Sequence, residues 1–379
     1  MQPFIDLASQ YTKNKESIDR AIKRVLDHGK YISGPEVAAF ESALQDFTGA
    51  SYALGCSSGT DALVLVLMAH GVKAGDAVIV PEFTYCATAE AVALVGATPI
   101  FVDICQDTWT MDPAHLQRAY QLANQKGLNC VGVIPVDIFG LPADYPVICQ
   151  EAEKLGMWVL ADGAQSFGAK QNNKRMGVLA PATATSFFPA KPLGCYGDGG
   201  AVFTSDQSFI DVLRSLRVHG QGADKYDNVR IGMNARLDTL QAAILIEKLT
   251  IYPEEIKRRQ QIAKIYQENL QGVKCQHVPE AHHSVWAQFT LQLPHENRAM
   301  IQSRLKERGV PTAVYYPRLL SQQTAYAHYP TTIAADSPTH RLVETVVSLP
   351  MHPYCADETV YRNCEIVNEV VAECVPVEA

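Results

Sequence analysis

Short apolar segments alternate with helix-like segments through the first 250 residues of the chain. The apolar segments are rich in valine and isoleucine without a regular polar face, as expected of strands covered on both sides. They are AVIV (77–80), TPIFVD (98–103), CVGVIPV (130–136) and MWVLAD (157–162). Segments with helical spacing lie between them, near residues 85–95 and 143–155. This order predicts an α/β fold with a doubly wound, mostly parallel sheet. Sheets of this kind bind ligands beyond the carboxyl ends of their strands.

The pattern changes after about residue 250. The segment IYPEEIKRRQQIAKIYQENL predicts a long polar helix that begins at Pro253. VWAQFTLQL (285–293) alternates strictly, which predicts a half-buried strand. We expect a large cofactor-binding domain over residues 1–250 and a smaller C-terminal α+β domain over residues 251–379. The last helix of that domain should place on one face Val360, Cys364, Val367, Val371 and Cys374.

The composition argues against several classes of protein. The chain has 379 residues, a formal net charge of -8 and no basic segment, so it lacks the electrostatic footprint of nucleic-acid or acidic-lipid binding. Its longest apolar run is too short to cross a bilayer, and its first residues do not resemble a secretory signal. The 10 cysteines are scattered singly, which favours thiols in a reducing cytosol over disulfides or a zinc site. We expect a cytoplasmic protein without a metal site.

The segment LGCSSGTDALVLVLMA (54–69) contains a candidate anion site. Ser57, Ser58, Gly59 and Thr60 separate a short strand candidate from an apolar helix. A serine hydroxyl accepts hydrogen bonds from the free N–H groups of a first helical turn, and glycine lets a ligand approach the backbone. The N-terminus of such a helix can bind a phosphate. An ordinary cap on a buried helix would explain the same residues.

Other polar or aromatic residues follow the predicted strands. Asp162 ends the strand MWVLAD and should project from the carboxyl edge of the sheet, with Gln165 three residues later. Tyr85 follows the strand at 77–80 and could stack on a flat ring. Asp162 could instead cap a loop, and Tyr85 could belong to the core.

Lys191 lies at the mouth of a turn crowded with proline and glycine, in TATSFFPAKPLGCYGDGGAVFTSD (183–206). Only a neutral amine attacks a carbonyl, and keeping a lysine neutral near pH 7 costs about 4 kcal/mol. Apolar neighbours such as Phe187 and Phe188 lower that cost, because burial disfavours the charged form. Lys191 is therefore a candidate nucleophile, although a surface lysine on a loop remains an alternative. The glycine spacing does not match the dinucleotide-binding pattern G-x-G-x-x-G.

Together these groups match the requirements of pyridoxal 5'-phosphate. This cofactor needs a lysine that holds its aldehyde as an imine, an acid that keeps its pyridine nitrogen protonated, and a cradle for its phosphate. Lys191, Asp162 and the helix start at Gly59 and Thr60 can supply the three groups, and Tyr85 can stack on the ring. The sequence therefore predicts an enzyme that uses this cofactor.

Longer motifs are spread over nearly the whole chain. They are FIDL, GPEVAAFE, SSGTDAL, TYCAT, DGAQ, SFFPAKPLGCYGDGGA, GMNARLDTLQAAIL and SLPMHP. These motifs resemble the DegT/DnrJ/EryC1/StrS family of sugar aminotransferases, which have fold type I and use pyridoxal phosphate. The chain looks most like the branch that aminates carbon 3 of nucleotide-linked sugars. In particular, it resembles the enzymes that act on UDP-2-acetamido-3-keto-glucuronate in bacterial surface polysaccharide synthesis.

The resemblance assigns a role to each cofactor-binding residue. It implies that Lys191 forms the imine with the cofactor and then shuttles protons. Asp162 is expected to pair with the pyridinium nitrogen, and Gln165 to lie beside the ring hydroxyl. The remaining cofactor contacts implied are Gly59, Thr60 and Ser186 at the phosphate and Tyr85 on the ring.

The resemblance also implies shared active sites in a homodimer. Asn234 corresponds to a loop that reaches the phosphate in the neighbouring subunit, and Arg236 is the natural ligand of a carboxylate. Tyr316 corresponds to a family tyrosine near the sugar. Tyr315 replaces a histidine that is frequent in the family. Arg318 appears two residues after Tyr316, either as a surface residue or as a further carboxylate ligand. These two departures bear on the identity of the sugar rather than on the reaction.

The reaction implied by the resemblance has two stages. L-glutamate donates its amino group and leaves as 2-oxoglutarate, with pyridoxamine phosphate formed on the enzyme, and the keto sugar then receives the amine. One alternative is a 3- or 4-aminotransferase for another UDP- or dTDP-linked keto sugar. A second is a non-catalytic regulator that binds pyridoxal phosphate.

Overall fold

The computed structural model describes residues 2–294 and 297–374 and contains a seven-stranded central sheet. The strand order is β1-β9-β8-β5-β4-β2-β3, in which β9 runs antiparallel to β1 and β8 and the other neighbours are parallel. The strands are β1 (Tyr52–Cys56), β2 (Asp76–Pro81), β3 (Thr98–Val102), β4 (Asn129–Val133), β5 (Trp158–Asp162), β8 (Ala182–Ser186) and β9 (Gly200–Thr204). The predicted α/β fold with a mostly parallel sheet is confirmed.

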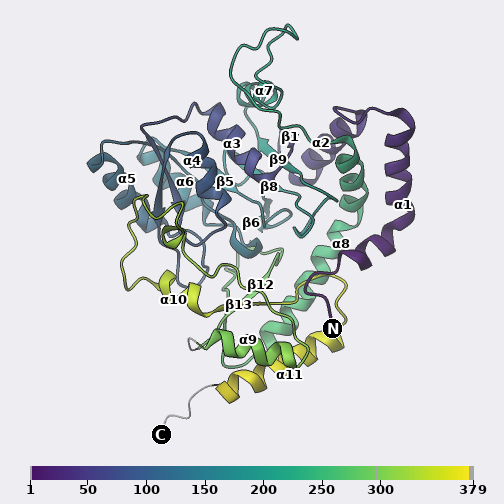
Figure 1. The fold of residues 1–379 in the computed structure, drawn as a ribbon, viewed down its shortest axis with the longest axis vertical. Helices are drawn as coiled ribbons and strands as arrows, with labels where there is room; N and C mark the ends of the chain where they lie inside the picture. The colour runs from purple at the N-terminus through teal and green to yellow at the C-terminus, as the bar shows by residue number, and fades with distance from the viewer. Residues whose placement is uncertain (1, 295–296, 375–379) are drawn as a thin grey trace.

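Helices cover both faces of this sheet (Figure 1). Successive strand residues point to opposite faces, so Val78 and Val80 pack with α3, α4 and α7, whereas Ala77 and Ile79 pack with α5 and α6. α2 and α8 cover the second face beside β1 and β9, and α1 packs on α8. Every residue of β2 is buried, which explains why the strand shows no polar alternation. The helices are α1 (Leu7–His28), α2 (Pro35–Thr48), α3 (Gly59–Ala69), α4 (Ala87–Leu94), α5 (Leu116–Gln125), α6 (Tyr145–Lys154), α7 (Gln207–Leu216) and α8 (Thr239–Asn269), with 3-10 turns η1 (Pro113–His115) and η2 (Ile138–Gly140).

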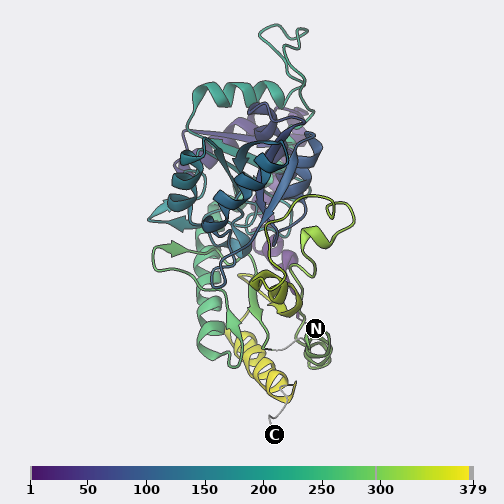
Figure 2. The same ribbon diagram turned by 90° about the vertical axis from the view of Figure 1, so that its left-hand side faces the viewer.

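A second, three-stranded sheet forms the core of the C-terminal region together with α8, α9 and α11 (Figures 1 and 2). The residues predicted to share one face of the last helix are all buried on α11. The elements are β10 (Lys274–Cys275), β12 (Phe289–Gln292), β13 (Val346–Leu349), α9 (Arg298–Glu307), η3 (Leu320–Gln322), α10 (Pro338–Thr345) and α11 (Asp357–Cys374). A third small sheet is formed by β6 (Lys170–Gln171), β7 (Lys174–Arg175) and β11 (His282–His283).

Two predicted elements differ from the structure. The long helix does not begin at Pro253, because α8 already begins at Thr239 and carries this proline in its interior. The strand predicted over residues 285–293 is shorter, and it is not half-buried. Its second face is also covered: Trp286 packs on Phe289, and the hydroxyl of Thr290 lies 2.8 Å from that of Ser348.

The helix α8 runs through the position of the predicted domain boundary. Its first half packs against the central sheet, and its second half packs in the core of the C-terminal region. The Arg259 guanidinium donates to the carbonyl oxygens of Trp286 and Met351 at 3.1 and 3.2 Å. The division into two domains at residue 250 stays a prediction. Among the helices in the described part of the chain, none is long and apolar enough to span a membrane.

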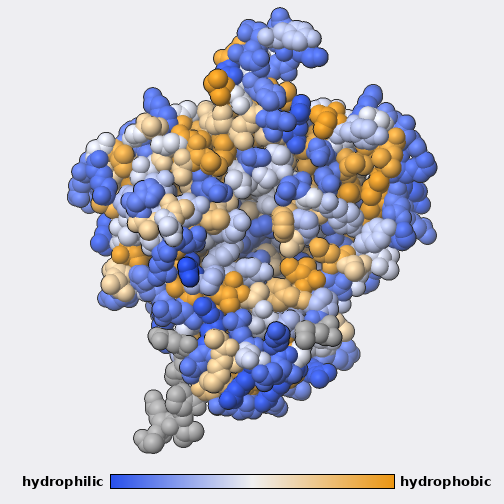
Figure 3. Space-filling view, in the orientation of Figure 1, coloured by the Kyte–Doolittle hydropathy of each residue, from blue (hydrophilic) through white to orange (hydrophobic). Residues whose placement is uncertain are grey.

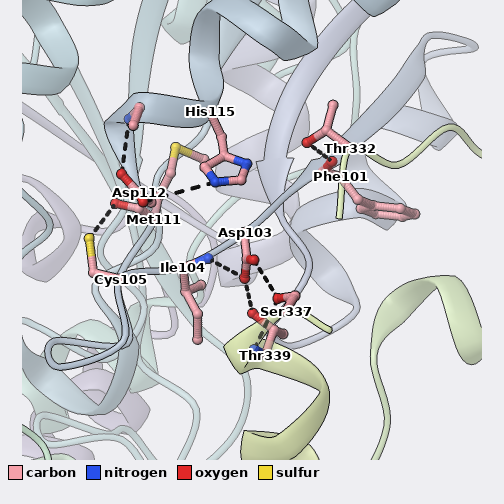
Figure 4. A network of polar contacts seen from close by, with 11 residues as sticks. Phe101, Asp103, Ile104, Cys105, Met111, Asp112, His115, Thr332, Ser337 and Thr339 are labelled. Atoms are coloured by element: carbon pink, nitrogen blue, oxygen red, sulfur yellow. Dashed lines mark hydrogen bonds and ion pairs between the residues drawn. The ribbon is translucent and has the colours of Figure 1, made fainter. Parts of the chain in front are cut away.

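Buried carboxylates fasten the segment before and at the start of α10 to the edge of the central sheet. Asp103, just after β3, accepts hydrogen bonds from the hydroxyls of Ser337 and Thr339 (Figure 4). Glu82, just after β2, accepts from the hydroxyl of Thr331 at 3.0 Å. The backbone adds a further link, from Thr332 N to the Phe101 carbonyl at 2.9 Å. These bonds tie the chain that follows Tyr315 and Tyr316 to the strands that carry the site.

An arm formed by residues 218–234 projects from the body of the molecule beyond α7 (Figures 1 and 2). Its base is closed by backbone pairing between Val218 and Asn234. Tyr226 and Ile231 on this arm are 87% and 86% exposed, and the space-filling view shows both polar and apolar surface there (Figure 3). Exposed apolar side chains on a projecting segment are typical of a protein contact.

Candidate active site

The carboxyl ends of the parallel strands meet at a cavity of about 440 Å³. Loops after β1, β2, β4, β5 and β8 contribute to its wall, as expected of ligand sites in parallel α/β sheets. Among the residues singled out in the sequence, the wall contains Gly59, Thr60, Tyr85, Asp162, Gln165, Ser186, Lys191, Tyr315 and Tyr316. The structure therefore brings most of the predicted site residues to one place.

Asp162 is a buried carboxylate at the tip of β5. The hydroxyl of Thr88 donates to its Oδ2 at 2.7 Å, and the backbone N–H of Ala164 donates to Oδ1 at 3.2 Å. Burial raises the pKa of Asp162, while Thr88, Ala164 and the nearby Lys191 act in the opposite direction. A cationic group bound against this carboxylate would favour its ionised form.

Lys191 lies in a tightly closed turn after β8. Its backbone N–H donates to the Phe188 carbonyl at 2.8 Å, and Cys195 N donates to the Phe187 carbonyl at 2.8 Å. Burial lowers the pKa of Lys191, and the charge of Asp162 opposes that change. Phe187 is buried, whereas Phe188 is half exposed at the cavity wall, so the apolar environment predicted for the lysine comes from the fold as well as from its neighbours in sequence.

The start of α3 forms a cradle beside the end of β8. Ser58 caps the helix by accepting from Asp61 N at 3.0 Å, and the first N–H groups of a helix have no partner within it. A Cβ atom on Gly59 would lie 2.7 Å from the Ser186 Cβ, and one on Gly200 would lie 2.3 Å from the Ser58 carbonyl oxygen. Glycine at both positions lets the backbone come close enough to form a compact anion site.

Gln165 connects two walls of the cavity. Its Oε1 accepts from Phe139 N at 2.6 Å, and its Nε2 donates to the Tyr316 hydroxyl at 3.1 Å. Burial raises the pKa of Tyr316, so its hydroxyl stays protonated. The ring of Tyr85 lies 5.9 Å from that of Tyr316 and is 55% exposed, which leaves it free to contact a ligand.

Three predicted residues do not line the cavity of this chain. Asn234 is exposed at the base of the arm, and Arg318 is exposed beyond Pro317. Arg236 lies next to the α3 cradle, because its backbone pairs with Cys56 at the end of β1. Its Nε atom is buried without a hydrogen-bond partner among the described residues.

Several residues of the site were missed in the sequence. Thr88 contacts Asp162 from α4, and Asp198 and Gln288 line the cavity. Gln288 carries no sequence signal, because its place in the wall depends on contacts between distant elements. Thr88 closes the motif TYCAT, but the motif alone does not show that Thr88 contacts Asp162. Asp137 was detectable, since it follows an apolar strand as Asp162 does.

Asp137 holds the loop beside Asp162. Its carboxylate accepts from Ala143 N at 2.9 Å, Tyr145 Oη at 2.6 Å and Ser166 Oγ at 2.5 Å. Its own N–H donates to the Asp162 carbonyl at 3.0 Å. Burial raises the pKa of Asp137 to about 7, although its three donors oppose that change.

This raised pKa predicts a pH-dependent stability of the protein without cofactor. An aspartate in the unfolded chain loses its proton at about pH 3.9. Between about pH 4 and pH 7 the folded state therefore binds more protons than the unfolded state. The contribution of Asp137 to the unfolding free energy should therefore fall as pH rises through that window. In Asp137→Asn, which cannot ionise, the Tm difference between about pH 5 and pH 7.5 should shrink by about 2–4 °C. The exposed Asp211→Asn serves as control, and an unchanged pH dependence in Asp137→Asn would refute the assignment.

Comparisons with known proteins give a consistent picture. Residues 12–368 match the DegT/DnrJ/EryC1/StrS aminotransferase family. The chain is 46% identical over 356 residues to the UDP-2-acetamido-2-deoxy-3-oxo-D-glucuronate aminotransferase of Pseudomonas aeruginosa, with 93% of this chain and 96% of that protein covered. A DegT DnrJ EryC1 StrS aminotransferase from Brucella abortus has a similar crystal structure, with a TM-score of 0.94, 43% identity, and 97% and 99% of the chains covered. NtdA from Bacillus subtilis with bound cofactor PMP gives a TM-score of 0.89 at 29% identity, covering 98% of this chain and 85% of NtdA.

The cavity fits the cofactor of these enzymes, pyridoxal 5'-phosphate. The buried carboxylate of Asp162 suits a protonated ring nitrogen, the amine of Lys191 suits an aldehyde, and the glycine-lined start of α3 suits a phosphate. The roles of the single residues are proposals. The family match covers nearly the whole chain. The chain therefore belongs to the DegT/DnrJ/EryC1/StrS aminotransferase family, whose members are pyridoxal phosphate-dependent enzymes of fold type I.

Proposed function

We propose that this enzyme transfers the amino group of L-glutamate to carbon 3 of UDP-2-acetamido-3-keto-glucuronate in the synthesis of a bacterial surface polysaccharide. The main support is the single cavity that gathers Lys191, Asp162 and the α3 cradle in a chain 46% identical to an aminotransferase for that sugar. The wall also contains Tyr315, Tyr316 and Gln288, which come from the C-terminal region. We propose that these three residues help to select the sugar.

The residues of the cavity have different roles in the proposed amino transfer. The cofactor, when bound, supplies an electron sink for the carbon that loses a proton. The lowered pKa of Lys191 increases its neutral fraction, so its amine can accept a proton at the reacting carbon and return it. Asp162 provides a fixed negative charge against the ring nitrogen. Gln165 and Tyr316 form a hydrogen-bonded wall that orients the ring.

The charges of the cavity support a site completed by a second copy of the chain. Among the wall residues in the described ranges, the charged ones are Lys191, Asp162 and Asp198. A nucleotide-linked uronate and the cofactor phosphate are anions that need further cations or N–H donors. We propose that Asn234 and Arg236 at the base of the arm supply them within a homodimer, in which the exposed Tyr226 and Ile231 bury their apolar surface.

A panel of keto sugars tests the proposed reaction. Purified holoenzyme is incubated with L-glutamate and the 3-keto forms of UDP-N-acetylglucuronate and UDP-N-acetylglucosamine, and with dTDP-linked 3- and 4-keto hexoses. We expect a 3-amino product, identified by NMR, and at least about tenfold higher kcat/KM for the uronate than for its neutral counterpart. Faster turnover of a dTDP sugar or amination at carbon 4 would favour the alternative aminotransferases. Tight cofactor binding without turnover of any sugar would favour a regulator.

Mixed dimers test whether the sites are shared. In a mixture of Lys191→Ala and Asn234→Ala chains, half of the dimers are mixed after random exchange. Each mixed dimer keeps one site with both residues intact, so activity should return to about a quarter of the wild-type value. Activity of each variant alone is the baseline. Absence of rescue, with mixed dimers demonstrated by differential tags, would mean that each site draws both residues from one chain.

A further inference from the structure

A second lysine, Lys248, is buried beneath the turn that carries Lys191. It lies in the interior part of α8 and is 1% exposed. Its Nζ donates to the carbonyl oxygen of Gly194 and lies 5.0 Å from the centre of the Tyr196 ring. Burying a lysine is costly, and a methionine would fill similar space at lower cost. The hydrogen bond to the Gly194 carbonyl offsets part of the cost of burying this amine.

The carbonyl that Lys248 binds is coupled closely to Lys191. Gly194 packs so tightly against the turn that a Cβ there would lie 2.5 Å from the Pro189 carbonyl oxygen and 2.6 Å from that of Phe188. The Phe188 carbonyl in turn accepts the backbone N–H of Lys191 at 2.8 Å. A shift of Gly194 would therefore move the peptide groups that hold Lys191 in the cavity.

A neighbouring residue of α8 supports the same turn. The side-chain amide of Gln241 accepts from Tyr196 N at 2.9 Å, and its Nε2 lies 3.5 Å from the Tyr196 carbonyl. The Sγ atom of Cys195 lies 3.0 and 3.1 Å from the Phe187 and Gly197 carbonyl oxygens, and its single S–H can donate to either. The turn is thus held by Cys195, which belongs to it, and by two side chains of α8, those of Lys248 and Gln241.

We propose that Lys248 is a positioning residue for Lys191, acting through the Gly194 carbonyl. Charged donors form stronger hydrogen bonds than neutral ones, and a rigid support holds a reactive side chain at its working position. Burial lowers the pKa of Lys248 to about 8, opposed by Glu255 and Cys195, so the amine is mostly charged near neutral pH. The inference rests on the proposed role of Lys191 as the residue that binds the cofactor.

The test compares Lys248→Met, which removes the donor, with Lys248→Arg, which retains one, and with Lys264→Met on the exposed side of the same helix. Three properties of the resting protein are measured: the Kd for pyridoxal phosphate, the pH midpoint of the cofactor absorbance band, and Tm. We expect Lys248→Met to raise the Kd about tenfold and to shift the pH midpoint, as loss of a charge-assisted bond implies. Lys248→Arg should recover part of both changes, and Lys264→Met should match the wild type.

A purely structural role would lower Tm alone. A wild-type Kd and pH midpoint in Lys248→Met would therefore overturn the inference, even if the variant were less stable. If Lys248→Met does not fold, Lys248→Gln replaces the charged donor with a neutral one, and a wild-type Kd and pH midpoint in that variant would overturn the inference too. Borohydride reduction and peptide mapping of the wild type separate the two proposals: an adduct on Lys248 or another lysine would refute the role of Lys191 itself.

Discussion

Lys191→Ala should lower turnover by about 10⁴-fold or more, because under the proposed roles of Lys191 the variant loses both the amine that binds the cofactor and the general base. The purified wild-type protein should be yellow, and borohydride should attach the cofactor irreversibly to the peptide that contains Lys191. The variant should bind the cofactor without a covalent link. Absorbance spectra, borohydride reduction with peptide mapping, and single-turnover rates with glutamate measure these effects.

The matched control is Lys264→Ala, which removes an exposed lysine of α8 that pairs with Glu268 at 3.7 Å. It should keep the colour, the adduct and the rate of the wild type. A borohydride-stable adduct that persists in Lys191→Ala would show that another amine holds the cofactor. That result would remove the basis for the proposed site.

Asp162→Asn should cost about 10²–10³-fold in turnover, as expected for loss of one preorganised electrostatic group. The amide keeps the shape of the carboxylate, but it carries no negative charge to hold a proton on the ring nitrogen. The cofactor should still bind, because the lysine and the phosphate cradle are unchanged. The measurement is kcat with saturating glutamate and keto sugar, together with the cofactor content of the purified variant.

A companion variant separates the charge of Asp162 from its hydrogen bond with Thr88. Thr88→Val removes the hydroxyl that donates to Oδ2 at 2.7 Å but leaves the carboxylate in place. It should reduce turnover less than Asp162→Asn, by about tenfold or less. Near-normal turnover in Asp162→Asn would exclude this carboxylate from the mechanism, whatever Thr88→Val does.

The sequence predicts the sheet and the edge of the site well, for a physical reason. Parallel strands bring their carboxyl ends to one edge, so the residues after each apolar segment are neighbours in space although they are distant along the chain. Asp162 and Tyr85 are predicted in this way, whereas Lys191 is singled out by its proline- and glycine-rich turn. The structure places all three at one cavity. Asp137 obeys the same rule and could have been included.

Other features depend on tertiary contacts that a linear pattern does not contain. The contact of Thr88 with Asp162 joins residues 74 positions apart, and although Thr88 closes the motif TYCAT, the linear pattern does not identify its partner. The second face of the strand near Thr290 is buried because a hydroxyl pair with Ser348 replaces the expected contact with water. Pro253 suggested a helix start, yet the apolar turns before it extend the same helix. Nothing in the structure explains Arg318.

The continuity of α8 has a consequence for building chimeras from related enzymes. A crossover at residue 250 would join two half-helices from different parents. It would separate Lys248, which binds the Gly194 carbonyl, from Arg259, which binds the Trp286 carbonyl. A junction in the loop after Asn269 would keep α8 with the parent that supplies Lys191. The bonds of Arg259 to the C-terminal region end on main-chain carbonyl oxygens, so they would tolerate a foreign partner sequence. If the C-terminal region selects the sugar as proposed, recombination at that loop would change the sugar preference and leave Lys191 and Asp162 with their own parent.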